Sequence, residues 1–142
     1  MQMTPTIAIH MSAALTALLI GPIALWARLG RTVRPQWHRA LGYAFVTCMV
    51  GAALSSLFIR DFRLPNMGGF TPIHLFVPLT FALLYRAVAH LRVGNVQGHR
   101  RAMQWLYFSA CIVAGAFTLL PHRYLGNLLW SAISGWTSGG VQ

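Results

Sequence analysis

Residues 71–80 read TPIHLFVPLT and open a long apolar segment that repeats a pattern found near the N-terminus. Residues 4–16 read TPTIAIHMSAALT, so a Thr-Pro pair, an Ile-His pair and a Leu-Thr pair recur in the same order. A His-Arg pair follows 28 residues after His10 and 25 residues after His74, and each pair opens the next apolar segment. The sequence therefore predicts one helical hairpin written twice, with a histidine at the head of each of four helices.

The apolar segments are long enough to cross a bilayer, which takes about 20 helical residues. Four such segments cover roughly residues 6–27, 39–59, 71–91 and 102–121. We therefore predict an all-α integral membrane protein with four transmembrane helices, arranged as two tandem hairpins related by a pseudo-two-fold axis.

The predicted single membrane domain covers residues 1–142, with hairpin repeats at about 4–60 and 71–121. A further segment, about 124–136, is too short to span and is rich in leucine and tryptophan. This composition is typical of a helix that lies at the membrane surface. We expect it to form a short C-terminal interfacial helix.

The composition also favours a membrane protein. Of the 142 residues 56% are hydrophobic and only 8% are charged, whereas charged residues make up about a quarter of an ordinary soluble domain. Eleven arginines, no lysine and one acidic residue, Asp61, give a net charge of +10. A soluble protein of this charge would suggest nucleic-acid binding, but these arginines lie in short connectors between apolar segments. The pattern therefore indicates contact with the lipid bilayer and excludes nucleic acid as the partner.

The arginines also predict an orientation. Eight of the eleven fall in the first and third connectors, and cytoplasmic loops carry the excess of arginine and lysine. We expect a multi-pass protein of the bacterial inner membrane with both termini in the periplasm. No basic residue precedes Arg28, so we expect the first segment to remain as a span and not to be a cleaved signal peptide.

The four histidines at the helix heads are candidate ligands, because an ionisable residue inside lipid is a functional-site hypothesis by default. Parallel repeats around an axis normal to the membrane would place His10 opposite His74 on the outer side and His38 opposite His99 on the inner side. Two facing imidazoles suit the axial ligation of an iron porphyrin. We therefore predict a b-type haem protein that relays electrons across or within the membrane, with a quinone or inside a larger complex.

Three arginines are candidate partners for haem propionates, since a guanidinium group binds carboxylates through two parallel hydrogen bonds. Arg39 and Arg100 each follow an inner histidine, and Arg101 comes next. Gly42 lies four residues after His38, on the same helix face, where it would leave room for a flat macrocycle.

Other functions fit the same residues. His122 would lie on the same side as His10 and His74, and three imidazoles can form a copper or zinc site. The chain can also be a structural or accessory subunit of a respiratory or photosynthetic complex, with histidines that serve packing, hydrogen bonding to a neighbouring helix or headgroup contact. With Asp61 as the lone carboxylate, there is little for general acid-base chemistry beyond histidine, and whether the protein is an enzyme stays open.

Four short motifs show a resemblance to a known family. They are His10 early in the first apolar segment, HRALG at 38–42, GFTPIHL at 69–75 and HRRAM at 99–103. In this combination the chain resembles, over residues 10 to about 120, the bacterial predicted-membrane-protein family named domain of unknown function 2306. The resemblance implies the four-helix architecture and a role for the four histidines, but no reaction. The layout is also similar to four-helix b-type cytochromes, with the difference that ligand pairing here must run between the two repeats.

Overall fold

Helices are the secondary structure of the described residues, together with short turns. The computed structural model describes residues 4–28, 34–59, 71–120 and 124–138, and every element in these ranges is helical. This confirms the predicted all-α fold. The elements in chain order are α1 (Pro5–Trp26), α2 (Pro35–Ser56), the 3₁₀-helix η1 (Pro72–Leu75), α3 (Phe76–Arg92), α4 (Val96–Leu106), the π-helix η2 (Tyr107–Val113), α5 (Ala114–Thr118) and α6 (Tyr124–Ser138).

The two Thr-Pro pairs of the repeat are helix starts. Thr4 is the N-cap of α1, where its hydroxyl accepts the Ile7 N–H at 3.4 Å, and Pro5 follows at the first helical position. Thr71 and Pro72 stand in the same positions at the start of η1. Threonine provides a side-chain acceptor at a helix start, and proline there loses only an N–H that has no intrahelical partner. The sequence repeat is therefore a repeat of capping chemistry.

The turn between α3 and α4 is set by Gly94 and Asn95. Gly94 has a φ of 72°, and its N–H donates to the Leu91 carbonyl at 3.1 Å while the Asn95 N–H donates to the His90 carbonyl at 2.8 Å. This is the Schellman arrangement, which needs a left-handed residue and so favours glycine. The Asn95 side chain then accepts the Gly98 N–H at 2.8 Å and caps α4.

Because Asn95 caps α4, the fourth helix begins earlier than predicted. The fourth segment was expected to begin near residue 102, but the fourth helix begins at Val96 and runs through α4, η2 and α5 to Thr118. His99 therefore lies near the head of this helix, as predicted, while Arg100 lies inside its first turns and not in a connector. Helix α2 likewise begins at Pro35, ahead of the predicted residue 39.

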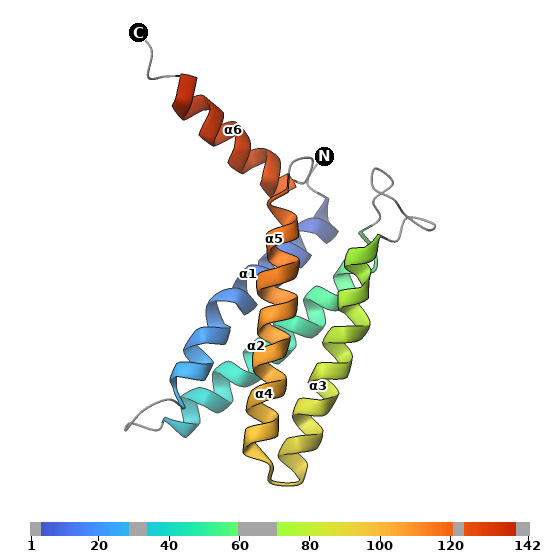
Figure 1. Cartoon of the computed structure of the whole chain (residues 1–142), viewed down its shortest axis with the longest axis vertical. Coiled ribbons are helices and arrows are strands. Elements are labelled where there is room, and N and C mark those ends of the chain that lie inside the picture. The colour runs from blue at the N-terminus through green and yellow to red at the C-terminus, as the bar shows by residue number, and fades with distance from the viewer. Residues whose placement is uncertain (1–3, 29–33, 60–70, 121–123, 139–142) are drawn as a thin grey trace.

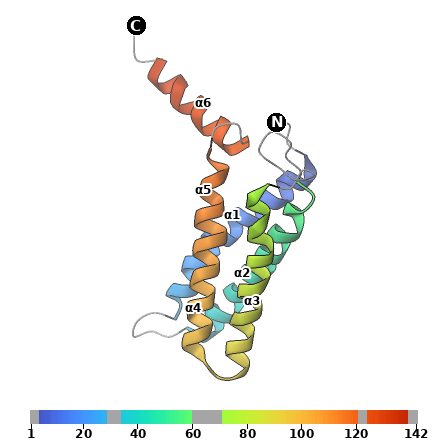
Figure 2. The ribbon, with the colours of Figure 1, turned by 45° about the vertical axis from the view of Figure 1, so that its right-hand side comes forward.

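The elements form two antiparallel hairpins (Figure 1). Helices α1 and α2 pack together along their length, and α3 packs against α4. The end of α1, the start of α2 and the turn between α3 and α4 lie at one end of the bundle, called here the hairpin-turn end, and the start of α1 lies at the other end, near α6. Figure 2 shows that α6 projects away from the four-helix body.

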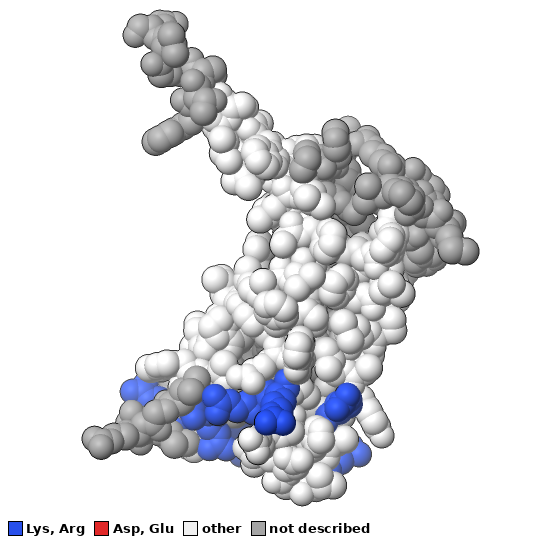
Figure 3. Space-filling view, viewed as in Figure 1, with Lys and Arg blue, Asp and Glu red and all other residues white. Residues whose placement is uncertain are grey.

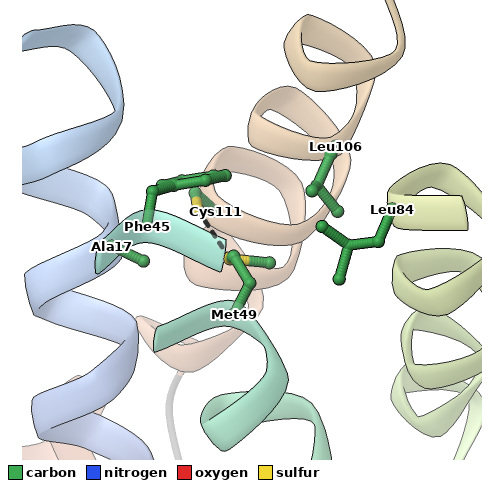
Figure 4. Packing of buried hydrophobic residues seen from close by; sticks show 6 residues of the cluster. All are labelled: Ala17, Phe45, Met49, Leu84, Leu106 and Cys111. Atoms are coloured by element: carbon green, nitrogen blue, oxygen red, sulfur yellow. Dashed lines mark hydrogen bonds between the residues drawn. The ribbon is translucent and has the colours of Figure 1, made fainter. Parts of the chain in front are cut away.

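The core between the hairpins is small. Ala17, Phe45, Met49, Leu84, Leu106 and Cys111 form its buried cluster (Figure 4), and the Cys111 thiol lies 3.7 Å from the Met49 sulfur. Many large apolar side chains are exposed, including Leu19 at 68% and Phe58 at 77%. A soluble monomer rarely exposes apolar surface so widely, whereas lipid-facing helices do so as a rule.

Among the described residues, two helices have both the length and the apolar composition to cross a membrane, Pro5–Trp26 and Pro72–Arg92. Helix α2 is equally long at 22 residues, but its His-Arg pair, glycines and serines make it more polar. The fourth helix is divided by η2 into shorter stretches. The segment predicted to form an interfacial helix is helical, as α6, and its location at a membrane surface stays a prediction. The Trp130 indole N–H donates to the Leu119 carbonyl at 3.2 Å.

Candidate functional site

A cavity of about 510 Å³ lies between the two hairpins, at the end of the bundle where α1 and α3 begin. Its walls come from α1, α2, η1, α3, η2 and α5, and Leu125 of α6 also lines it. The lining is almost entirely apolar, apart from a few hydroxyl groups and two histidines. Cofactor and ligand pockets in proteins have volumes of about 300–1,000 Å³ and this kind of lining.

The two histidines are His10 and His74, one from each repeat. The sequence predicted that the repeat would bring them together, and both line this cavity. The two rings make different hydrogen bonds, however, and these bonds determine which ring nitrogen of each histidine could bind a metal.

His10 is anchored by Nδ1. This nitrogen lies 2.9 Å from the Ala52 carbonyl of α2 and 3.3 Å from the Ser55 hydroxyl. Because a carbonyl only accepts hydrogen bonds, we assign the proton to Nδ1, which leaves a lone pair on Nε2. Nε2 has no hydrogen-bond partner among the described residues. A histidine that ligates a metal is usually oriented in this way, by its other ring nitrogen.

His74 has the opposite tautomer. The Thr71 N–H donates to His74 Nδ1 at 3.2 Å, so this nitrogen is an acceptor. His74 Nε2 lies 3.2 Å from the Ile59 carbonyl and must donate to it. The side chain thus closes the first turn of η1 and joins η1 to Ile59, which follows α2.

His38 and His99 are bonded within their own hairpins. His38 Nδ1 lies 2.8 Å from the Ala24 carbonyl, and His99 Nδ1 lies 3.0 Å from the Ala87 carbonyl. In both cases the histidine in the first turns of the second helix reaches back to the last turns of the first helix. Neither residue lines the cavity. Their predicted pairing across the repeats stays a prediction, while their packing role within each hairpin is directly visible.

The first hairpin is therefore closed at both ends by reciprocal bonds, from His10 of α1 to α2 and from His38 of α2 to α1. The second hairpin has the corresponding bond at its turn end, from His99 to the Ala87 carbonyl. His74 instead bonds to the Ile59 carbonyl that follows α2. It faces η2 and α5 of the fourth helix across the cavity that all of them line.

A family model described as a predicted membrane protein, DUF2306, matches residues 7–135. The chain belongs to this DUF2306 family. The match contains all four repeat histidines and reaches into α6, so it confirms the resemblance carried by the sequence motifs. No curated protein and no solved structure matches the chain.

The three arginines proposed as propionate partners lie at the opposite end of the bundle from the cavity lined by His10 and His74. Arg39, Arg100 and Arg101 are exposed in the first turns of α2 and α4, at the end of the bundle that carries the hairpin turns (Figure 3). They cannot serve a group held by His10 and His74, and their predicted role stays tied to the inner histidines. Gly42 has open space around it, since a Cβ atom there would meet nothing within 4 Å.

The predicted copper or zinc site depends on His122, which lies outside the described residues. Within the described ranges no group of three or more His, Cys, Asp or Glu side chains could hold a metal ion.

Sequence reasoning missed the π-helix and what it contributes. Ala110, Cys111 and Ile112 of η2 line the cavity, as does Gly115 of α5. π-turns inside α-helices occur frequently at functional sites. The only sequence signal was a run of small residues in this segment, which is equally common wherever membrane helices touch.

Proposed function

We propose that this membrane protein binds haem b in the cavity between its hairpins, with His10 and His74 as axial ligands, and relays electrons through it. The observation that carries the proposal is that one histidine from each repeat lines a single apolar cavity of about 510 Å³. Electrons would come from a quinol in the bilayer or from a partner subunit, since no other redox group is implied by the sequence.

The proposed topology has four membrane-spanning helices in the bacterial inner membrane. The described arginines gather at the hairpin-turn end (Figure 3), and the positive-inside rule favours the cytoplasm for that end. The termini would then be periplasmic, and the cavity would lie on the periplasmic side of the bilayer. Helix α6 would lie along that surface, with its exposed Leu128, Leu129 and Trp130 in contact with lipid.

The residues around the cavity fit a haem. His10 offers a free Nε2 lone pair and is oriented by its bond to the Ala52 carbonyl. For His74 to offer Nε2 as a ligand, its proton would have to move to Nδ1, so the bond to the Ile59 carbonyl and the bond from the Thr71 N–H would both be given up. Each of these bonds contributes about 1 kcal/mol. The Nδ1 proton could then be donated to the Thr71 carbonyl at 3.2 Å. The apolar walls would exclude water from the macrocycle. When bound, the haem supplies reversible one-electron transfer.

The absorption spectrum of the purified full-length protein tests this proposal. A Soret band with split α-bands after dithionite reduction is the expected result. We expect His10→Gln and His74→Gln to remove the signal of this haem, since glutamine keeps an N–H donor but is no iron ligand. His90→Gln is the matched control, because His90 lies at the end of α3 and outside the cavity.

The other outcomes contradict the proposal. A colourless protein with stoichiometric copper or zinc would favour a metal site that includes His122. A colourless, metal-free protein that co-purifies with a respiratory or photosynthetic complex would favour the accessory-subunit function. A haem signal that survives both His10→Gln and His74→Gln in folded, monodisperse protein would exclude these ligands.

A further inference from the structure

The hairpin-turn end of the bundle carries an unpaired positive surface. All the arginines that the structure describes are exposed at this end (Figure 3). No ion pair joins any of them to another described residue, and the described ranges contain no acidic side chain. We call this set the arginine face: Arg28, Arg34, Arg39, Arg86, Arg92, Arg100 and Arg101.

Exposed aromatic side chains beside the arginine face indicate its level relative to a bilayer. Trp26 and Trp37 flank the first hairpin turn, at 61% and 62% exposure, and the Arg34 guanidinium lies 5.7 Å from the centre of the Trp26 ring. Tyr85 and Trp105 are 75% and 63% exposed on the second hairpin. Tryptophan and tyrosine prefer the headgroup level of a bilayer. The guanidinium groups beside them therefore lie where lipid phosphates lie.

The chemistry of the arginine face suits phosphate. The chain has eleven arginines and no lysine, and a guanidinium group presents parallel N–H donors that match two phosphate oxygens, which an ammonium group does not. A phosphate contact of this kind satisfies charge and hydrogen bonding together, and no protein group among the described residues does so.

The arginines also come from both hairpins, which meet only loosely at this end. Helix α4 packs against α3 and η2, and its packing on α1 and α2 is sparse. Arg28 follows α1 and Arg92 ends α3, so they occupy equivalent places in the two repeats. An anionic group between the repeats would reduce the repulsion between two like-charged hairpins.

We propose that the arginine face binds the phosphates of anionic glycerophospholipids in the adjacent leaflet, and that these lipids hold the two hairpins together at the hairpin-turn end. The charge, the absence of described acidic partners and the flanking aromatic residues favour a lipid over a soluble anion. This proposal does not depend on the haem proposal.

Thermal unfolding of the full-length protein in neutral detergent micelles tests it. Phosphatidylglycerol or phosphatidylcholine is added at equal mole fractions, and inorganic phosphate is added in a third arm. We expect phosphatidylglycerol to raise the Tm, since a ligand that binds only the folded state stabilises it, and phosphatidylcholine to raise it much less. The effect of phosphatidylglycerol should shrink in about 1 M NaCl, where charges are screened within about 3 Å.

The variant Arg28→Gln/Arg92→Gln removes one arginine from each repeat. We expect the phosphatidylglycerol concentration at half-maximal effect to rise about fivefold for each arginine removed. Arg28→Lys/Arg92→Lys is the matched variant that keeps the charge, and it should show a smaller loss. Equal effects of the two lipids on the wild-type protein would overturn the proposal even if the variants fail to fold. An equal effect of inorganic phosphate would show a soluble-anion site instead.

Discussion

The Tyr107 hydroxyl donates a hydrogen bond of 3.1 Å to the Leu18 carbonyl of α1. In a regular helix this carbonyl would accept the N–H of the residue four positions later, which here is Pro22 and has no N–H. Tyr107 thus supplies the partner that the proline removes, from the first residue of the π-helix. In a membrane, a proline inside a helix is tolerated when a neighbouring helix satisfies the freed carbonyl.

We predict that Tyr107→Phe lowers the free energy of unfolding by about 1 kcal/mol, because it leaves the Leu18 carbonyl without a donor. The measurement is unfolding by denaturing detergent in mixed micelles. Tyr43→Phe is the control, since Tyr43 is 71% exposed and its hydroxyl bonds to no described residue. In a Pro22→Ala background the helix regains its own donor, so Tyr107→Phe should then cost little. A cost that is equal in both backgrounds would contradict this account.

Gly21 leaves room for the Tyr107 ring, whose hydroxyl bonds to the Leu18 carbonyl. A Cβ atom at Gly21 would lie 2.6 Å from the Tyr107 ring and 3.2 Å from the Phe45 ring, whereas one at Gly51 would meet nothing within 4 Å. We predict that Gly21→Ala destabilises the protein by about 1–3 kcal/mol through overpacking. Gly51→Ala should instead stabilise it by up to about 1 kcal/mol, because alanine favours the helix. Equal signs for the two substitutions, measured in the same micelles, would show that the Gly21 contact is not close.

His38 tests whether the inner histidines act in packing or in ligation. His38→Ala removes the bond to the Ala24 carbonyl and should cost about 1 kcal/mol of unfolding free energy, while His38→Gln can keep a donor there and should cost less. The predicted inner haem requires His38 and His99 to be ligands, so His38→Gln should then reduce the haem content from two per chain to one. An unchanged haem content would show that His38 and His99 act in packing within their hairpins and not as haem ligands.

Much of the fold could be predicted because its signals are local. The Thr-Pro pairs mark helix starts by capping, and the repeat of Ile-His after them predicted that His10 and His74 share one site. The fourth helix begins earlier than the predicted span of residues 102–121, which left Arg100 and Arg101 in the connector. A helix needs only a cap to begin, and Asn95 provides it.

The cavity could not be predicted, because it depends on where a helix changes its pitch. The π-helix at Tyr107–Val113 has no sequence signature, yet its residues Ala110, Cys111 and Ile112 line the cavity opposite His74. The hydrogen-bonded states of His10 and His74 were equally hidden, since each depends on a carbonyl far away in the sequence, at Ala52 and Ile59.

Gly115 offers a direct test of the cavity as a binding site. It lines the cavity, and a Cβ atom there would meet nothing within 4 Å, so Gly115→Leu adds a side chain to open space and not to packed neighbours. We predict that Gly115→Leu leaves the protein folded and monodisperse but strongly reduces the haem bound per chain. Gly51→Leu is the matched control, because Gly51 also has open space around it but lies outside the cavity. If both variants bind haem as the wild type does, the haem lies elsewhere, because a filled cavity cannot hold the macrocycle between His10 and His74.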